Sequence, residues 1–192
     1  MVGGYVGQTA IKTQNVVNKA LGGVLFIDEA YSLLSTDNYS KECIATLIKA
    51  MEDHRDNLCV ILAGYSQEME ELLKSNTGFE SRIAFKIDFP NYTETELYKI
   101  FNNMLKQEGF KLSRNCKSIV QDYFNNEIIN NKESFSNGRL VRNLTEKIKM
   151  EQANRIIKDK SNNLDLIVAD DIKAVVEKIK TKPRKPTIGF TA

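Results

Sequence analysis

The sequence predicts an α/β fold, with a parallel sheet in the first half of the chain and helices in the second half. Three short segments rich in β-forming residues, 24–27, 57–65 and 83–90, are separated by segments with helical periodicity. Strands that alternate with helices in this way pair in parallel. The first segment is continuously apolar, as expected of a strand covered on both faces. After Pro90 the apolar residues recur at helical spacing.

Helices are predicted on both sides of the first strand. An apolar repeat that includes Ile11 predicts a helix from Thr9, with Thr9 as its cap. Further helices are expected over 39–51 and 66–73, because their apolar residues form one stripe. Residues 76–82 are predicted to form a loop.

The second half contains several predicted helices. The segment 93–109 begins with a capping-box pattern, Thr93 with Glu96, and ends at a glycine. Further helical segments are expected over 113–129 and 138–158, and 164–179 is expected to be a short apolar piece followed by a capped helix.

The change of pattern near Pro90 predicts a domain boundary. We expect the carboxyl-terminal part of an α/β domain over 1–91 and an all-helical domain over 92–180. Residues 181–192 contain two prolines and few apolar residues, which predicts a mobile tail.

The composition narrows the possible partners. A net charge of +2 is too small to favour nucleic acid, and no apolar run approaches the length of a membrane span. We therefore expect neither nucleic acid nor a membrane as a partner. The three cysteines, Cys43, Cys59 and Cys116, follow no metal-binding spacing, and their odd number favours a reducing cytoplasm over a disulfide framework.

The candidate chemistry lies where the first strand ends. The stretch GGVLFIDEAYSLL places Asp28 and Glu29 directly after an apolar strand, at the edge where open α/β sheets bind ligands. Hydrolysis of a nucleoside triphosphate uses one carboxylate to hold Mg²⁺ and another to orient and deprotonate the attacking water. The alternative is a strand that ends in a solvated loop with an incidental acidic pair.

Several motifs, in this order, resemble the AAA+ ATPases of the CbbX and stage V sporulation protein K branch. They are GGYVGQTAIKT, GGVLFIDEAYSL, VILAGYSQEMEELLKSNTGFESRIAFKIDFPNYTETEL and SNGRLVRNLTEKIKMEQANRI. The resemblance covers residues 2–158 and implies part of an AAA+ nucleotide-binding core over 1–91, followed by a helical lid over 92–180.

The resemblance also implies roles for single residues. Asp28 would bind Mg²⁺ at the end of the Walker B strand, and Glu29 would be the catalytic base. Arg82 matches the arginine finger, which reaches the ATP of a neighbouring subunit. Arg139 matches the sensor-2 arginine, which contacts the nucleotide of its own subunit. Tyr65 stands at or near the sensor-1 position, where the family often has asparagine or threonine.

Other residues of these motifs keep alternative interpretations. Tyr5 and Val6 match the pore loop that grips a threaded polypeptide, but Tyr5 could instead pack locally. Arg82 taken alone could be a solvated loop arginine. Arg142 competes with Arg139, whose position at a helix N-terminus opposes the helix dipole and thereby favours an anionic partner.

One expected motif is absent. The sequence contains no G-x-x-x-x-G-K-[ST] loop, whose backbone amides and lysine hold the phosphates. In the family this loop precedes GGYVGQ, so the resemblance predicts that the first strand, the phosphate loop, the following helix and the second strand lie upstream. The first strand of the family lies between those expected here at 24–28 and 84–89. The sheet must therefore rearrange, be completed by another chain, or take that strand from a separate segment.

The sequence therefore predicts part of an AAA+ ATPase that couples ATP hydrolysis to remodelling or threading of a polypeptide. The intact protein would bind ATP and Mg²⁺ and form a ring of its own copies, expected to be a hexamer. The chain alone is expected to be inactive. The alternative is a short, non-catalytic module that docks on a complete AAA+ ring. A nucleic-acid ATPase such as a clamp loader is disfavoured, because the chain has no basic stripe.

Overall fold

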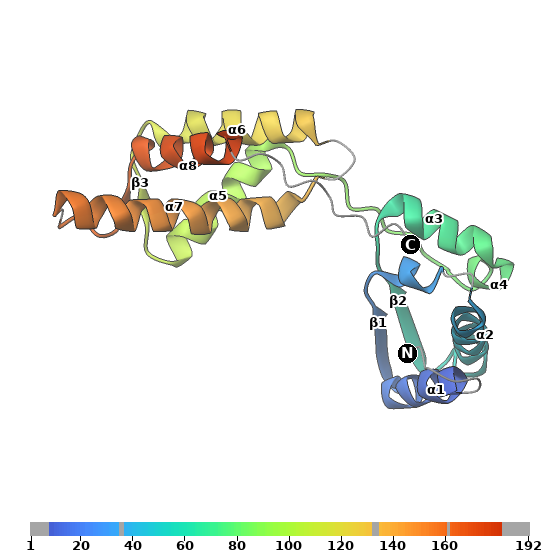
Figure 1. Cartoon of the computed structure of the whole chain (residues 1–192). Helices are drawn as coiled ribbons and strands as arrows, with labels where there is room; N and C mark the ends of the chain where they lie inside the picture. Colours follow the sequence, from blue (N-terminus) through green and yellow to red (C-terminus); the bar gives the residue numbers. More distant parts are fainter. Residues whose placement is uncertain (1–7, 35–36, 132–134, 161, 182–192) are drawn as a thin grey trace. The chain divides into compact units, whose positions relative to one another are not determined.

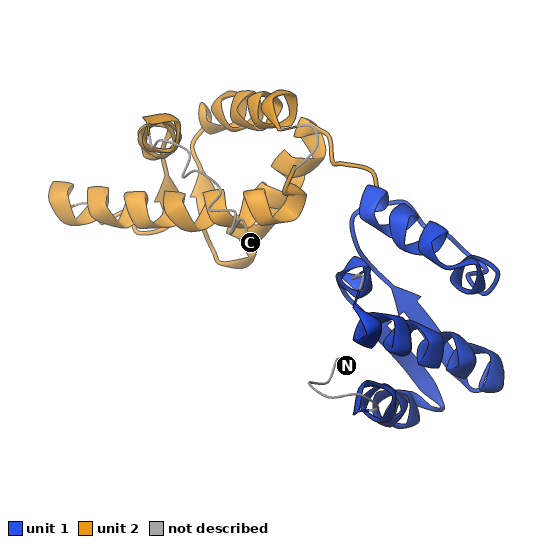
Figure 2. Cartoon of the chain, turned by 45° about the vertical axis from the view of Figure 1, so that its right-hand side comes forward, with its two compact units in different colours: residues 1–89 blue, residues 90–192 orange. Residues whose placement is uncertain are grey.

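The computed structural model describes residues 8–34, 37–131, 135–160 and 162–181 (Figure 1). The chain divides into two compact units, residues 1–89 and 90–192, as Figure 2 shows. Each unit has its own buried core. None of the helices in the described ranges is long and apolar enough to cross a membrane.

Unit 1 is built on a two-stranded parallel sheet. Strand β1 pairs with β2 so that Gly23 lies opposite Leu58 and Ile27 opposite Leu62. This confirms the parallel pairing predicted from the alternation of strands and helices. The elements in chain order are α1 (Gln8–Ala20), β1 (Gly23–Ile27), the 3₁₀ helix η1 (Ala30–Leu33), α2 (Asn38–Asp53), β2 (Leu58–Leu62), α3 (Ser66–Ser75) and α4 (Thr77–Glu80).

One face of this sheet is covered by the described residues and the other is not. Leu25 of β1 is buried in one cluster with Leu47 of α2 and Leu72 of α3. Alternate strand residues point to the opposite face. The prediction of a strand covered on both faces is therefore wrong for the described part, because its helices pack on a single face. We call the exposed residues of the other face the bare face: Val24, Phe26, Cys59 and Ile61.

The third strand predicted over 83–90 is not formed. Residues 83–93 have no regular structure, and the side chains of Phe85, Ile87 and Phe89 are 85%, 76% and 89% exposed. The alternating apolar pattern suits a strand, but a strand requires a neighbour for its backbone N–H and C=O groups. No such neighbour lies beside this segment among the described residues, so the sheet of unit 1 ends at two strands.

The first helix differs from its prediction. It begins at Gln8, so Thr9 lies inside the helix and is buried instead of capping it. Ile11, predicted on the apolar stripe, is exposed. The buried residues of α1 include Thr13, whose hydroxyl donates to Sγ of Cys43 on α2 at 3.3 Å. The helix therefore packs on α2 through small side chains, which the apolar repeat does not reveal.

The predicted loop at 76–82 contains the short helix α4. The side chain of Asn76 caps it by accepting a hydrogen bond from the N–H of Gly78 at 2.9 Å. Phe79 of this helix is fully buried in the core of unit 1. The cap and the buried ring explain why this short segment is helical.

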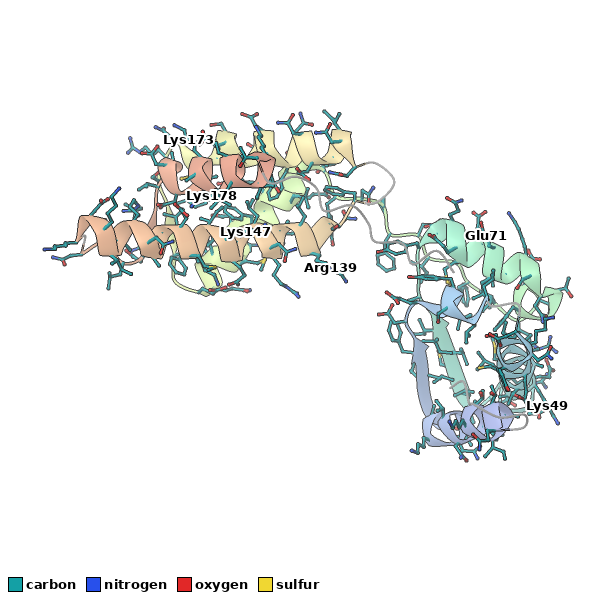
Figure 3. All side chains as sticks on the ribbon, viewed as in Figure 1. Lys49, Glu71, Arg139, Lys147, Lys173 and Lys178 are labelled. Carbon is teal, nitrogen blue, oxygen red and sulfur yellow. The ribbon has the colours of Figure 1, made fainter. Side chains whose placement is uncertain are left out.

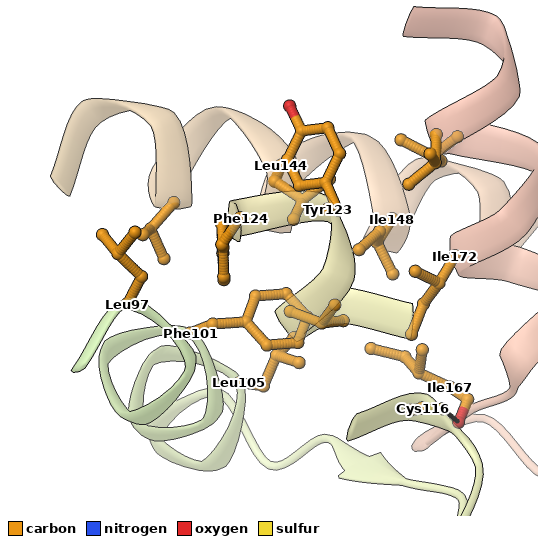
Figure 4. Close-up of a cluster of buried hydrophobic side chains, with 14 residues drawn as sticks. Leu97, Phe101, Leu105, Cys116, Tyr123, Phe124, Leu144, Ile148, Ile167 and Ile172 are labelled. Carbon is orange, nitrogen blue, oxygen red and sulfur yellow. Dashed lines mark hydrogen bonds between the residues drawn. The ribbon is translucent and has the colours of Figure 1, made fainter. Parts of the chain in front are cut away.

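The described part of unit 2 contains four long helices and one small sheet. The predicted helical segments and the helical lid are confirmed, and a two-residue parallel pair also joins two of its loops. The elements are α5 (Glu94–Gln107), β3 (Lys111–Leu112), α6 (Cys116–Asn130), α7 (Asn137–Asp159), β4 (Leu166–Ile167) and α8 (Ala169–Thr181). Figure 4 shows side chains from all four helices meeting in the core, among them Phe101, Phe124, Ile148 and Ile172.

The first helix of unit 2 begins with the predicted capping box. The N–H of Glu96 donates to the Thr93 hydroxyl at 3.3 Å, and the N–H of Thr93 donates to the Glu96 carboxylate at 2.9 Å. The bond from the Thr93 backbone favours the ionised carboxylate and lowers the pKa of Glu96. The start of α5 is therefore fixed by local sequence.

A buried ion pair joins α7 to α8. Nε of Arg155 donates to Oδ1 of Asp171 at 2.7 Å, and Nη2 donates to Oδ2 at 3.1 Å. The Asp171 side chain is 1% exposed and also accepts from the N–H of Val168 at 2.9 Å. Nη2 donates as well to the carbonyl of Leu166 in β4 at 2.9 Å. The pair thus ties both helices to the small sheet and raises the pKa of Arg155.

Candidate functional site

The chain turns sharply where β1 ends. Glu29 has φ 49° and ψ 44°, a left-handed conformation that residues other than glycine rarely adopt. Its N–H donates to Oδ1 of Asp28 at 3.0 Å. The N–H of Ala30 donates to the carbonyl of Ala63 at 2.9 Å, which fixes the turn to the end of β2. Both carboxylates are exposed to solvent. The turn therefore presents two acids, in a fixed order, at the carboxyl edge of the sheet.

Tyr65 lies at the same edge, directly before α3. The N–H of Ala63 donates to the carbonyl of Ile27 at 2.9 Å, which extends the hydrogen bonding between β1 and β2 by one residue beyond β2. The rings of Tyr31 and Tyr65 then stack, with their centroids 6.1 Å apart and their planes 28° from parallel. The structure thereby brings Tyr65 together with the segment that follows Glu29.

Tyr31 is a residue of this edge that the sequence does not single out. Its ring lies against Gly64, where a Cβ would approach Cδ1 of the ring to 2.7 Å and Sδ of Met69 to 2.8 Å. Burial raises the pKa of the Tyr31 hydroxyl, and the negative charge of Glu29 raises it further. The one sequence signal is the glycine shortly after β2, because only glycine leaves room for the ring.

Asp28 fits a metal site that needs a single carboxylate from the protein. In the described ranges no three His, Cys, Asp or Glu side chains gather into a metal cage. Mg²⁺ beside phosphates does not need such a cage, because it keeps several waters and takes one or two carboxylates. The sequence contains no glycine-rich loop whose backbone amides could hold the phosphates of a nucleotide. Asp28 could therefore bind Mg²⁺, but this sequence contains no loop that would bind the phosphates.

Arg82 follows α4 and is anchored within its own unit. Its backbone N–H donates to the carbonyl of the buried Phe79 at 3.0 Å. Nε of the guanidinium lies 3.2 Å from Oε2 of Glu52, and Nη1 donates to the carbonyl of Gly78 at 3.2 Å. Across the described residues, Arg82 forms no hydrogen bond or ion pair with the acids of the Glu29 turn. The structure therefore does not bring Arg82 together with that turn.

Arg139 lies in the first turn of α7 and is exposed (Figure 3). The start of this helix is fixed by Asn137, which has φ 42°. The Asn137 side chain accepts from the N–H of Tyr92 at 2.9 Å and donates to Oδ1 of Asn91 at 2.7 Å. Asn137 belongs to no predicted site motif, although asparagine tolerates the left-handed conformation better than most residues do.

The remaining predicted site residues, Tyr5 and Val6, lie outside the described residues, as does the predicted tail beyond residue 181.

Two family profiles match the chain in succession. The profile described as "ATPase family associated with various cellular activities (AAA)" matches residues 1–91, and the AAA lid domain matches residues 93–182. The chain therefore belongs to the AAA ATPase family.

Its relatives place it in the CbbX and stage V sporulation protein K branch, which confirms the resemblance. Protein CbbX of Cereibacter sphaeroides is 42% identical over 168 residues, which cover 86% of this chain and 54% of CbbX. Stage V sporulation protein K of Bacillus subtilis is 43% identical over 160 residues, which cover 82% of this chain and 50% of that protein. The chain thus spans about half the length of these relatives.

Solved structures agree on the fold. The AAA domain of FIGL-1 matches with a TM-score of 0.64 at 17% identity, over 91% of this chain and 57% of that one. A point mutant of Thermotoga maritima RuvB matches with a TM-score of 0.61 at 17% identity, over 90% of this chain and 50% of that one.

Proposed function

We propose that this chain carries the catalytic carboxylates of an AAA ATPase whose complete form hydrolyses ATP with Mg²⁺. The observation that carries the proposal is the left-handed turn at Glu29, held between Asp28 and the end of β2. Backbone strain of this kind persists where the surrounding structure enforces it, and it is concentrated at active sites. Membership of the AAA family supports the choice of reaction.

The two acids have different roles in this proposal. When bound, ATP would supply the phosphoryl group that water attacks, and Mg²⁺ would balance the charge of the phosphates. Asp28 holds the metal through its carboxylate, and the bond from the Glu29 N–H keeps that carboxylate oriented. Glu29 orients the attacking water and accepts its proton, a contribution of about 10²–10⁴ in rate. The Tyr65 hydroxyl, at the end of the neighbouring strand, is the group we assign to the sensor-1 position.

The arginines act on the phosphates in this proposal. Arg82 contacts the nucleotide of a neighbouring copy, so the complete protein works as a ring. Arg139, exposed at the start of α7, contacts the nucleotide of its own copy. The pore-loop residues Tyr5 and Val6 suit a polypeptide substrate, which the ring would thread or remodel.

A phosphate-release assay on two proteins tests the reaction. We expect the complete protein to hydrolyse ATP with Mg²⁺ and to stop when EDTA removes the metal. The 192-residue chain alone should release no phosphate, because it has no phosphate loop. Turnover by the chain alone would contradict the proposal, as would an inactive complete protein.

A second candidate function is favoured by the exposed apolar residues of unit 1. The bare face and the unpaired segment 83–90 leave large apolar side chains in water, as expected of a surface that binds another protein. On this alternative the chain docks on a complete AAA ring without catalysing hydrolysis. Addition of the chain to an active ring should then change its turnover, whereas an unchanged rate removes this candidate.

A further inference from the structure

We propose that Glu52 is a positioning residue for Arg82. It holds Nε of the guanidinium so that Nη2 stays available to a phosphate of the neighbouring copy's nucleotide. The inference rests on the proposed function, in which Arg82 acts in trans, and adds a residue that the sequence motifs do not indicate.

Helix α4 packs closely against α2, the helix that carries Glu52. A Cβ on Gly78 would lie 3.3 Å from two methyl carbons of Ile48 on α2 and 3.0 Å from Oδ1 of its cap, Asn76. The ring of Phe79 is fully buried beside this contact. This close packing fixes the distance between the backbones of α4 and α2. Because Arg82 comes shortly after α4, its backbone position relative to Glu52 is fixed as well.

The guanidinium of Arg82 is held by contacts to α2 and α4. Nε of Arg82 is shielded from solvent and makes no aligned hydrogen bond within the described residues. The nearest carboxylate oxygen is Oε2 of Glu52 at 3.2 Å, so this carboxylate compensates the buried N–H by its charge. Nη1 donates to the carbonyl of Gly78 at 3.2 Å and lies 3.4 Å from Oγ of Ser81. These contacts occupy Nε and Nη1 and leave Nη2.

Nη2 is the remaining nitrogen of the Arg82 guanidinium. An arginine carries five N–H donors in a rigid, planar fork, so a group held at Nε and Nη1 can still present Nη2 to a phosphate. No hydrogen bond of Nη2 of Arg82 is present in the described part of the chain, and the side chain is 31% exposed. Without Glu52 the buried Nε would lose its compensating charge, and the side chain would turn toward water. The fork would then lose its orientation.

The test uses the complete protein, assayed for ATP turnover at saturating and limiting ATP. Arg82→Ala should lower kcat by about 10³–10⁵. Glu52→Ala should lower kcat by about 10- to 100-fold with KM for ATP unchanged, because Glu52 acts on orientation and a displacement of about 1 Å can cost that much. Glu52→Asp, which keeps the negative charge beside Nε, should retain more activity than Glu52→Ala.

The double variant separates positioning from a structural role. Because Glu52 acts only through Arg82, Arg82→Ala combined with Glu52→Ala should be no slower than Arg82→Ala alone. Asp53→Asn is the matched control, since Asp53 is the next residue on α2 and is exposed. It should leave kcat unchanged.

The outcomes distinguish the two claims. An unchanged kcat in Arg82→Ala overturns the trans role of Arg82, and the positioning role with it. A large loss in Arg82→Ala together with a normal kcat in Glu52→Ala overturns only the positioning role. Multiplied losses in the double variant also overturn it, because Glu52 would then act independently of Arg82.

Discussion

The ring of Tyr31 lies so close to the backbone of Gly64 that a Cβ there would approach Cδ1 of the ring to 2.7 Å. This fit places Tyr31 where it stacks on Tyr65, at the end of the second strand. Because Tyr31 lies in the 3₁₀ helix that begins directly after Glu29, the glycine links the Glu29 turn to the end of β2.

Gly64→Ala should therefore destabilise unit 1. The added methyl must displace the Tyr31 ring and the side chain of Met69, and overpacking of this kind costs about 1–3 kcal/mol in free energy of unfolding. Urea unfolding followed by circular dichroism measures the change. Gly23→Ala is the control, since its Cβ would meet only a backbone oxygen of Ala20 at 3.5 Å. Equal stability of the two variants would show that Tyr31 does not need the glycine.

The buried ion pair of unit 2 gives a second prediction. Asp171→Ala leaves the guanidinium of Arg155 without its carboxylate and the N–H of Val168 without its acceptor. Removal of one partner of a fully buried pair costs about 3–5 kcal/mol in free energy of unfolding, and the loss here should be smaller because the Arg155 side chain is 23% exposed and can reach water. Urea unfolding of the helical unit measures this loss. Asp170→Ala is the control, because it breaks only an exposed pair with Lys173 at 3.7 Å and should cost little. Similar losses in the two variants would contradict the role of the Arg155 pair.

The capping box predicts a dependence of stability on pH. The pKa of Glu96 is lowered in the folded state from its ordinary value of 4.5, mainly by the bond from the Thr93 backbone. Its ionised form therefore stabilises the fold above pH 4.5, and this contribution is lost as the pH falls through the lowered pKa. Glu96→Gln should be less stable than the parent at about pH 7, and the difference should shrink as the pH falls below 4.5 and through the lowered pKa. Urea midpoints of both proteins across this range measure it. A difference that stays constant with pH would rule out the carboxylate as its cause.

The sequence predicts best what local residues determine. The capping box of Thr93 and Glu96 depends on residues three apart, and it forms as predicted. The position of Asp28 and Glu29 at a sheet edge follows from a strand-and-helix alternation that the structure confirms.

The errors concern contacts between distant segments. The segment 83–90 has a strand pattern but no partner in the described residues, and a pattern cannot supply one. The same reasoning applies to the site, where Glu52 meets Arg82 and Tyr31 meets Gly64 only after the chain has folded. Propensity and periodicity carry no information about these pairs.

The most direct test of the central claim is the ATP turnover of Glu29→Gln in the complete protein. Glutamine keeps the size of the side chain but cannot accept the proton of the attacking water. We predict that the variant binds ATP and Mg²⁺ with the affinity of the parent and hydrolyses ATP about 10²–10⁴ times more slowly. Unchanged turnover in this variant would contradict the assignment of Glu29 as the catalytic base.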